Sequence, residues 1–204
     1  GVSALSVIEA INQAGDVQTL NVHINSPGGD VFEGRAIMAA LAAFRGKTVA
    51  HIDSLCASAA TSIALACNEI RMAEGAFFMI HNASGFAWGD KTELRNTADV
   101  LEKIEGAIVN DYTSRTGKPE QEIRDKMQAE TWFTAQEALE YGFIDSITEK
   151  STAKNTWNLS AFANAPKPEP DPPEPVKNET EPAPEAGFFM SAANANRLRI
   201  AQIA

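Results

Sequence analysis

The sequence predicts an α/β fold in which parallel strands lie between helices. Over residues 1–150, runs typical of strands alternate in regular order with amphipathic helical patterns. This alternation is typical of repeated β-α units around a parallel sheet. The length of 204 residues suffices for one well-buried domain and a tail, but not for two full domains and a tail.

The first half of the globular part alternates helix and strand. TLNVHIN has the alternating pattern of a half-buried strand, and Ile37 and Leu41 lie on one side of the helix that follows it. The expected elements are a helix over residues 3–14, a strand over 19–25, a helix over 32–44, a strand over 47–53 and a small-residue helix over 59–66.

The second half contains one long helix. Asp90 and Glu93 have the spacing of a capping box, and Gly117 with Pro119 predicts the end of the helix. Thr134 begins a second such box, for a helix that ends at Gly142. The expected elements are strands over 69–73 and 76–81, a helix over 90–117, further helices to 142 and a last strand over 143–147.

Composition divides the chain into three parts. Residues 1–150 form the expected domain, and because they begin with a helical pattern we expect that an N-terminal strand is missing. Residues 151–187 are rich in Pro and Glu, which predicts an extended acidic linker. Residues 188–204 show a short helical pattern, typical of an assembly or targeting peptide.

The net charge and the cysteine content exclude some classes of function for this protein. A net charge of −10 argues against nucleic-acid partners, since phosphate binding needs clustered Lys and Arg. Cys56 and Cys67 lie in an apolar stretch, as expected of reduced thiols in a cytosol-like compartment. No apolar run suggests a membrane helix and no signal peptide is visible, so we expect a cytoplasmic location. The three scattered histidines do not have metal-ligand spacing, and we expect neither a metal nor a cofactor.

The turn after the first strand contains Pro27, Gly28 and Gly29 in succession. One interpretation is a tight turn from strand to helix. The other is that glycine amides ahead of the helix point outward, as the donors of an oxyanion hole must.

An oxyanion hole needs a nucleophile beside it. Ser58 follows the second predicted strand and precedes a helix of small residues, where free amides favour a developing anion. The simpler alternative is that Ser54, Ser58, Thr61 and Ser62 only pack or cap. Cys56 is a second possible nucleophile, although a buried thiol is the simpler interpretation.

A serine nucleophile also needs a base. His23 and His51 lie within predicted strands, and the pattern assigns neither a role. His81 ends an apolar strand and begins a loop, so that a rigid element would hold it at an exposed edge. A histidine at a strand end can equally be an ordinary surface residue.

Four segments resemble successive motifs of the Clp protease proteolytic subunit (peptidase S14-like), and more closely its phage-encoded relatives, the head maturation or prohead proteases. The segments are INSPGGDVFEG, CASAATSIA, FFMIHNASG and ETWFTAQEALEYGFID, and the similarity runs in order from about Val17 to Ile147. The resemblance implies a Clp/crotonase-like fold with a long protruding helix.

The resemblance also implies roles for individual residues. Ser58 matches the nucleophile and His81 the general base, and the amides of Gly29 and Ala59 match the oxyanion hole. The family's aspartate aligns with Glu130, whose extra methylene changes the geometry of a triad.

One fallback residue and two further departures from the family pattern complete the comparison. Asp125, on the preceding predicted helix, is a fallback for the third triad member. Ser54 stands where relatives often have glycine. The loop after His81 differs from that of the Clp subunit, which affects specificity.

The resemblance implies an ATP-independent serine endopeptidase that forms an acyl-enzyme. For the phage type, the substrates would be scaffold or capsid precursors, in the bacterial cytoplasm or the assembling prohead. A ring-shaped homo-oligomer is expected. An unfoldase ATPase is not implied, because the axial segment that contacts one is not visible. Two alternatives are an inactive ring-forming assembly module and a crotonase-type acyl-CoA enzyme, which also holds an oxyanion with glycine amides.

Overall fold

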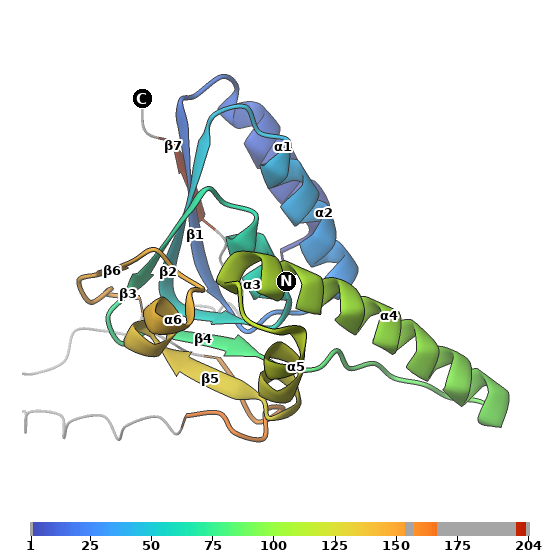
Figure 1. The fold of residues 1–204 in the computed structure, drawn as a ribbon. Helices are drawn as coiled ribbons and strands as arrows, with labels where there is room; N and C mark the ends of the chain where they lie inside the picture. Colours follow the sequence, from blue (N-terminus) through green and yellow to red (C-terminus); the bar gives the residue numbers. More distant parts are fainter. Residues whose placement is uncertain (1, 154–156, 167–198, 203–204) are drawn as a thin grey trace, which may run out of the picture.

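The structure, a computed structural model, describes residues 2–153, 157–166 and 199–202 and has the predicted α/β architecture (Figure 1). In chain order the helices are α1 (Ala4–Ala14), α2 (Val31–Ala42), α3 (Ala59–Leu65), α4 (Lys91–Thr116), α5 (Glu120–Gln128) and α6 (Ala135–Tyr141). The strands are β1 (Thr19–Ser26), β2 (Lys47–Ala57), β3 (Glu69–Ala73), β4 (Phe77–Ile80), β5 (Thr131–Thr134), β6 (Ser146–Thr148) and β7 (Arg199–Gln202).

The strands form one mixed, mainly parallel sheet. Strand β2 is central: its first half pairs in parallel with β1 and β3, and its last residues pair in parallel with β4. The register between β1 and β2 shifts after Ile24, where β2 turns toward β4. As a result, the carboxyl ends of β1, β2 and β4 come together, as is typical of the ligand-binding edge of a parallel sheet.

The predicted helix signals are confirmed. The Asp90 side chain accepts from the N–H of Glu93, whose carboxylate accepts from the N–H of Asp90, as a capping box requires. Gly117 ends α4 in the left-handed conformation, and Thr134 begins α6 with a second capping box. In Figure 1, α4 projects well beyond the body of the molecule.

Several elements differ from the sequence prediction. Strand β2 continues to Ala57, because its end pairs with β4. Strand β5, antiparallel to β4, lies where we predicted no strand. Strand β6, predicted over 143–147, begins at Ser146 rather than Phe143, because the Phe143 N–H still bonds to the Ala138 carbonyl at the end of α6.

The tail also differs from the prediction. Residues 157–166 were assigned to the linker, but Trp157, Leu159 and Phe162 pack against the domain, because this first part of the tail is apolar. Residues 199–202 form a strand rather than part of a helix, since the free edge of β1 offers backbone partners. The rest of the predicted terminal helix lies outside the described residues.

The core occupies the space between the sheet and its helices. Apolar residues of α1–α3 pack against β1 and β2, and Phe78 stacks on Phe143. Cys56 is fully buried and Cys67 is 6% exposed; burial raises the pKa of both thiols, so neither is available as a nucleophile. Within the described ranges, no helix is both long and apolar enough to cross a membrane.

Candidate active site

Ser58 lies between the end of β2 and the start of α3. Its backbone has φ 55° and ψ −128°, a conformation that costs energy in a residue other than glycine and is characteristic of functional turns. Its N–H bonds to the carbonyl of Met79 on β4 at 3.0 Å. The Ser58 hydroxyl makes no capping bond to α3, so that it is available to other groups.

His81 directly follows β4, and its Nε2 lies 2.7 Å from Oγ of Ser58. The two side chains meet because Ala57 pairs with Met79 at the end of neighbouring parallel strands. Burial lowers the pKa of His81, and the charge of Glu130 raises it by a smaller amount. The ring is therefore neutral near pH 7, as a proton acceptor must be.

The turn of Pro27, Gly28 and Gly29 packs directly onto Ser58. A Cβ atom on Gly28 would lie 2.6 Å from the carbonyl oxygen of Ala57 and 2.7 Å from Cβ of Ser58, and φ at Gly28 is 95°. Gly28 is therefore required for the close approach of two backbone turns.

Gly29 has a different environment from Gly28. A Cβ atom on Gly29 would point into open space, and the residue lines the same cavity as Ser58 and His81. As the first residue of α3, Ala59 has an N–H with no acceptor inside the helix. Both residues predicted for the oxyanion hole thus border the space beside Oγ of Ser58.

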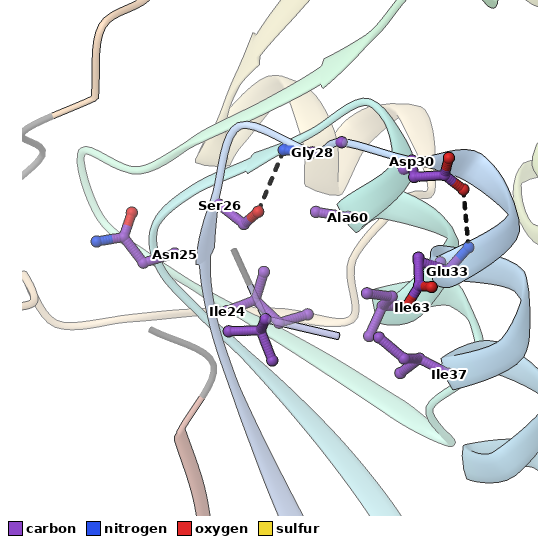
Figure 2. A pocket seen from close by; sticks show the side chains of 13 residues that line it. Ile24, Asn25, Ser26, Gly28, Asp30, Glu33, Ile37, Ala60 and Ile63 are labelled. Carbon is purple, nitrogen blue, oxygen red and sulfur yellow. Dashed lines mark hydrogen bonds between the residues drawn. The ribbon is translucent and has the colours of Figure 1, made fainter. Parts of the chain in front are cut away.

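Two cavities flank the glycine turn. One, of about 480 Å³, is lined by Ser58 and His81 and also by Val100, Leu101 and Ile104 of α4. The other, of about 270 Å³, borders the same turn and is mainly apolar, with Ile24, Ile37 and Ile63 among its lining residues (Figure 2). Ser58 and His81 do not line the second cavity, so the first is the candidate substrate cleft.

Glu130 does not bond to His81 in the described part of the chain. Its carboxylate accepts from Nε1 of Trp132 at 3.1 Å and from the backbone N–H groups of Ala163 and Asn164 at 2.9 and 2.6 Å. Glu130 is still close enough for its charge to raise the pKa of His81. Asp125, the fallback, is exposed on α5 and bonds to Gln121.

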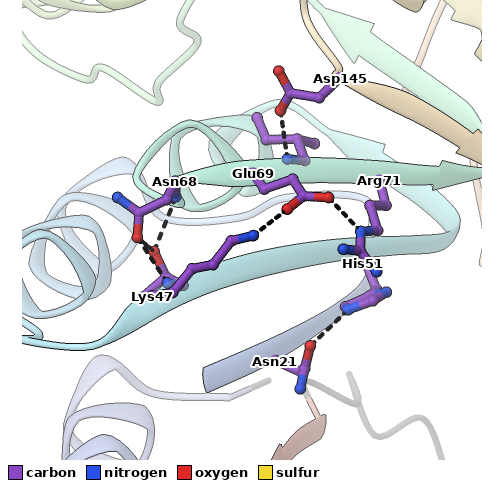
Figure 3. A network of polar contacts seen from close by, with 9 residues as sticks. Asn21, Lys47, His51, Asn68, Glu69, Arg71 and Asp145 are labelled. Atoms are coloured by element: carbon purple, nitrogen blue, oxygen red, sulfur yellow. Dashed lines mark hydrogen bonds and ion pairs between the residues drawn. The ribbon is translucent and has the colours of Figure 1, made fainter. Parts of the chain in front are cut away.

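The other two histidines belong to a polar face of the sheet. His23 and His51 stack at 4.7 Å, with His23 bonded to Asp53 and His51 to Asn21. On the same face Glu69 bridges Lys47 and Arg71 (Figure 3), and these bonds lower the pKa of Glu69 to about 2. Neither histidine lines the cavity of Ser58.

A buried hydroxyl pair supports the turn at Ser58, and it was not predicted from the sequence. Oγ1 of Thr61 donates to the carbonyl of Ser58 at 2.6 Å and lies 2.6 Å from the hydroxyl of Tyr112, which is the donor in this second bond. The pair connects the Ser58 turn to α4. Tyr112 falls among the apolar positions of a long helix, so nothing in the pattern indicated a polar role.

Replacing Tyr112 by phenylalanine tests this connection. Tyr112→Phe is expected to lower the free energy of unfolding by about 1 kcal/mol, because one buried hydrogen bond is lost and Thr61 keeps its bond to Ser58. Urea unfolding measures the change. No loss of stability would show that the hydroxyl pair does not connect α3 to α4.

The fold and the Ser58–His81 contact define the chain as an α/β protein in which a serine and a histidine side chain meet at neighbouring strand ends. The sequence profile of the family described as Clp protease matches residues 2–151. The chain belongs to the Clp protease family, which confirms the family and fold predicted from the motifs.

Individual relatives agree with this assignment. The chain is 32% identical over 138 residues to an ATP-dependent Clp protease proteolytic subunit 2 of Thermobifida fusca, covering 63% of this chain and 64% of the relative. It is 29% identical over 148 residues to the proteolytic subunit of Porphyromonas gingivalis, covering 69% of this chain and 64% of the relative. The chain thus spans about 64% of the length of these two relatives.

A solved structure shows the same fold. A ClpP1 mutant from Listeria monocytogenes superimposes with a TM-score of 0.66 at 22% identity, covering 72% of this chain and 84% of that protein. At this level of identity the similarity concerns the fold alone.

Proposed function

We propose that this protein is a serine endopeptidase that hydrolyses peptide bonds through an acyl-enzyme on Ser58. The observation that carries the proposal is the 2.7 Å contact between Oγ of Ser58 and Nε2 of His81. In the tautomer with the proton on Nδ1, the Ser58 hydroxyl donates to Nε2, so that His81 takes the proton as Oγ attacks the peptide carbonyl.

The glycine turn supplies the second requirement of this reaction. As the tetrahedral intermediate forms, negative charge develops on the carbonyl oxygen, and the N–H groups of Gly29 and Ala59 border the place where it would lie. His81 then returns its proton to the leaving amine, and water releases the acyl group by the same route. Glu130 assists by stabilising the protonated ring through its charge.

The pH dependence of acylation tests the role of His81. A protonated ring cannot accept the Ser58 proton, so acylation is lost as the pH falls through the pKa of His81. Because burial lowers that pKa, half-maximal rate is expected below the pH near 6.5 at which an ordinary histidine titrates. The rate of fluorophosphonate labelling from pH 5 to 8, followed by intact mass, measures this. A rate that rises on acidification would contradict the assignment.

The particular biological role rests on the resemblance to phage head maturation proteases. We propose an ATP-independent enzyme that cleaves scaffold or capsid precursors in the host cytoplasm or the prohead, as a ring-shaped homo-oligomer. Purified enzyme and its Ser58→Ala variant, each mixed with capsid precursor, test the substrate. Cleavage by the wild type alone supports the role, and an uncut precursor opposes it.

Light scattering tests the proposed ring-shaped homo-oligomer. A measured mass equal to one chain would contradict it.

One observation favours the non-catalytic alternative. A complete triad would require a hydrogen bond between Glu130 and His81. Within the described ranges no such bond is present, since the Glu130 carboxylate bonds to Trp132, Ala163 and Asn164. An assembly module would form intact oligomers without serine labelling or turnover. The family match favours a peptidase over the acyl-CoA alternative.

A further inference from the structure

Residues 157–166, here called the strap, cross the sheet beside the cavity of Ser58. At one end Nε1 of Trp157 donates to the side chain of Asn25, directly ahead of the glycine turn. Leu159 and Phe162 pack onto a buried cluster of Leu55, Ala57 and Met79, which lies under the ends of β2 and β4. The strap is therefore fixed to the two strands that position Ser58 and His81.

Phe162 touches the His81 ring. The ring centroids lie 5.6 Å apart at an interplanar angle of 63°, and Phe162 makes a second edge contact with Trp132 at 5.7 Å. Phe162 also lines the cavity that contains Ser58. The side chain thus packs against the imidazole at the wall of this cavity.

The strap also holds Glu130. The N–H groups of Ala163 and Asn164 donate to its two carboxylate oxygens, and the side-chain amide of Asn164 donates to the carbonyl of Ala129 at 2.9 Å. Glu130 has φ 47°, an unfavourable conformation for this residue, so the contacts must hold it in place. Consecutive residues of the strap therefore engage both His81 and the acid beside it.

We propose that the strap is part of the catalytic apparatus, with Phe162 as a positioning residue that packs on His81 while the next two amides fix the carboxylate of Glu130. The inference rests on the proposed peptidase function, because it assigns the strap to the base of that reaction. It extends the catalytic unit beyond the region matched by the family, which ends at residue 151.

Among the described residues, few charged groups lie near His81. The effect of Phe162 on the pKa of His81 can therefore be separated from the effects of neighbouring charges. Glu130 is the charged group whose field reaches the ring, and it raises the pKa. Asp30 lines the same cavity, but its carboxylate caps α2. The side chains of α4 and of the strap that line the cavity carry no charge near neutral pH, and the Tyr112 hydroxyl is held neutral by burial, which raises its pKa. Desolvation is the larger influence on His81, and Phe162 contributes to it.

The test compares Phe162→Ala with Phe162→Leu in the full chain. Phe162→Ala admits water to the imidazole, whereas leucine keeps an apolar cover. Leu5→Ala is the control, because Leu5 is a large apolar side chain on α1 that is 67% exposed and does not line the cavity. NMR titration of the His81 ring, assigned with a His81→Gln variant, gives the midpoint directly, and fluorophosphonate labelling gives the rate as a function of pH.

In Phe162→Ala, the midpoint of His81 is expected to move to higher pH, and labelling at pH 6 to fall several-fold while recovering at pH 8.5. Phe162→Leu and Leu5→Ala should follow the wild type. If Phe162→Ala does not fold, Phe162→Val provides the same comparison with less loss of volume.

An unchanged midpoint in Phe162→Ala, or a rate lowered equally at every pH, would overturn the role of the strap. Absence of labelling in the wild type at all pH values would instead reject the proposed peptidase. The NMR midpoint would still decide whether Phe162 controls His81, because it does not depend on turnover.

Discussion

Ser58→Ala is expected to lower the turnover of any peptide substrate by about 10⁴-fold or more, to the level that substrate binding and the oxyanion donors alone provide. Oγ of Ser58 is the atom that contacts His81 and would form the acyl bond, and alanine has no replacement for it. Stability should change little, because the backbone bond from Ser58 to Met79 remains. Rates from single-turnover assays with matched protein amounts measure the loss.

Ser54→Ala is the matched control for this substitution. Ser54 lies four residues earlier on β2 and does not line the cavity of Ser58. The Ser54→Ala variant should retain wild-type turnover and fluorophosphonate labelling. Equal activity in Ser58→Ala and wild type would remove Ser58 as nucleophile, and equal losses in both variants would point to a general effect on the fold.

Gly28→Ala has the second largest expected effect. The new Cβ would meet the carbonyl oxygen of Ala57 at 2.6 Å and Cβ of Ser58 at 2.7 Å, so that one of the two backbone turns must move. A displacement of about 1 Å at a reacting group is enough to lower the rate by about 10²-fold. The clash and the positive φ should also cost about 1–3 kcal/mol of stability.

Gly75→Ala is the control that separates the effect of the Cβ clash at Gly28 from the effect of placing alanine at a positive φ. Gly75 also has a positive φ, of 82°, but its Cβ position meets no atom within 4 Å. It should lose about 1–2 kcal/mol of unfolding free energy and keep full labelling activity. Denaturant unfolding and labelling rates on both variants give the comparison. If the two glycine variants had the same activity, the turn would not control the position of Ser58.

The local parts of the fold were predictable from the sequence because local signals determine them. The capping box at Asp90, the left-handed glycine at Gly117 and the alternation of β1 each act within a few residues. The short strand β5 was not predictable, because its pairing with β4 depends on a partner about fifty residues away in the sequence. The same reason explains the extension of β2 toward β4.

In the candidate site, too, the parts set by local sequence were predictable and the parts set by distant contacts were not. Ser58, His81 and the glycine turn each lie at the end of a predicted strand, and parallel pairing brings those ends together. The surroundings of Glu130 could not be read from the chain, because they depend on Phe162 and the amides that follow it, which composition had assigned to a linker. Apolar residues ahead of the Pro- and Glu-rich stretch were the signal that could have indicated this packing.

The most direct test of the central claim is intact-mass analysis of the folded protein after fluorophosphonate treatment, with the modified residue located by peptide sequencing. We expect a single adduct per chain on Ser58, lost in Ser58→Ala and slowed on acidification as His81 becomes protonated. An unmodified protein, or an adduct on a residue other than Ser58, would contradict the assignment of Ser58 as a nucleophile activated by His81.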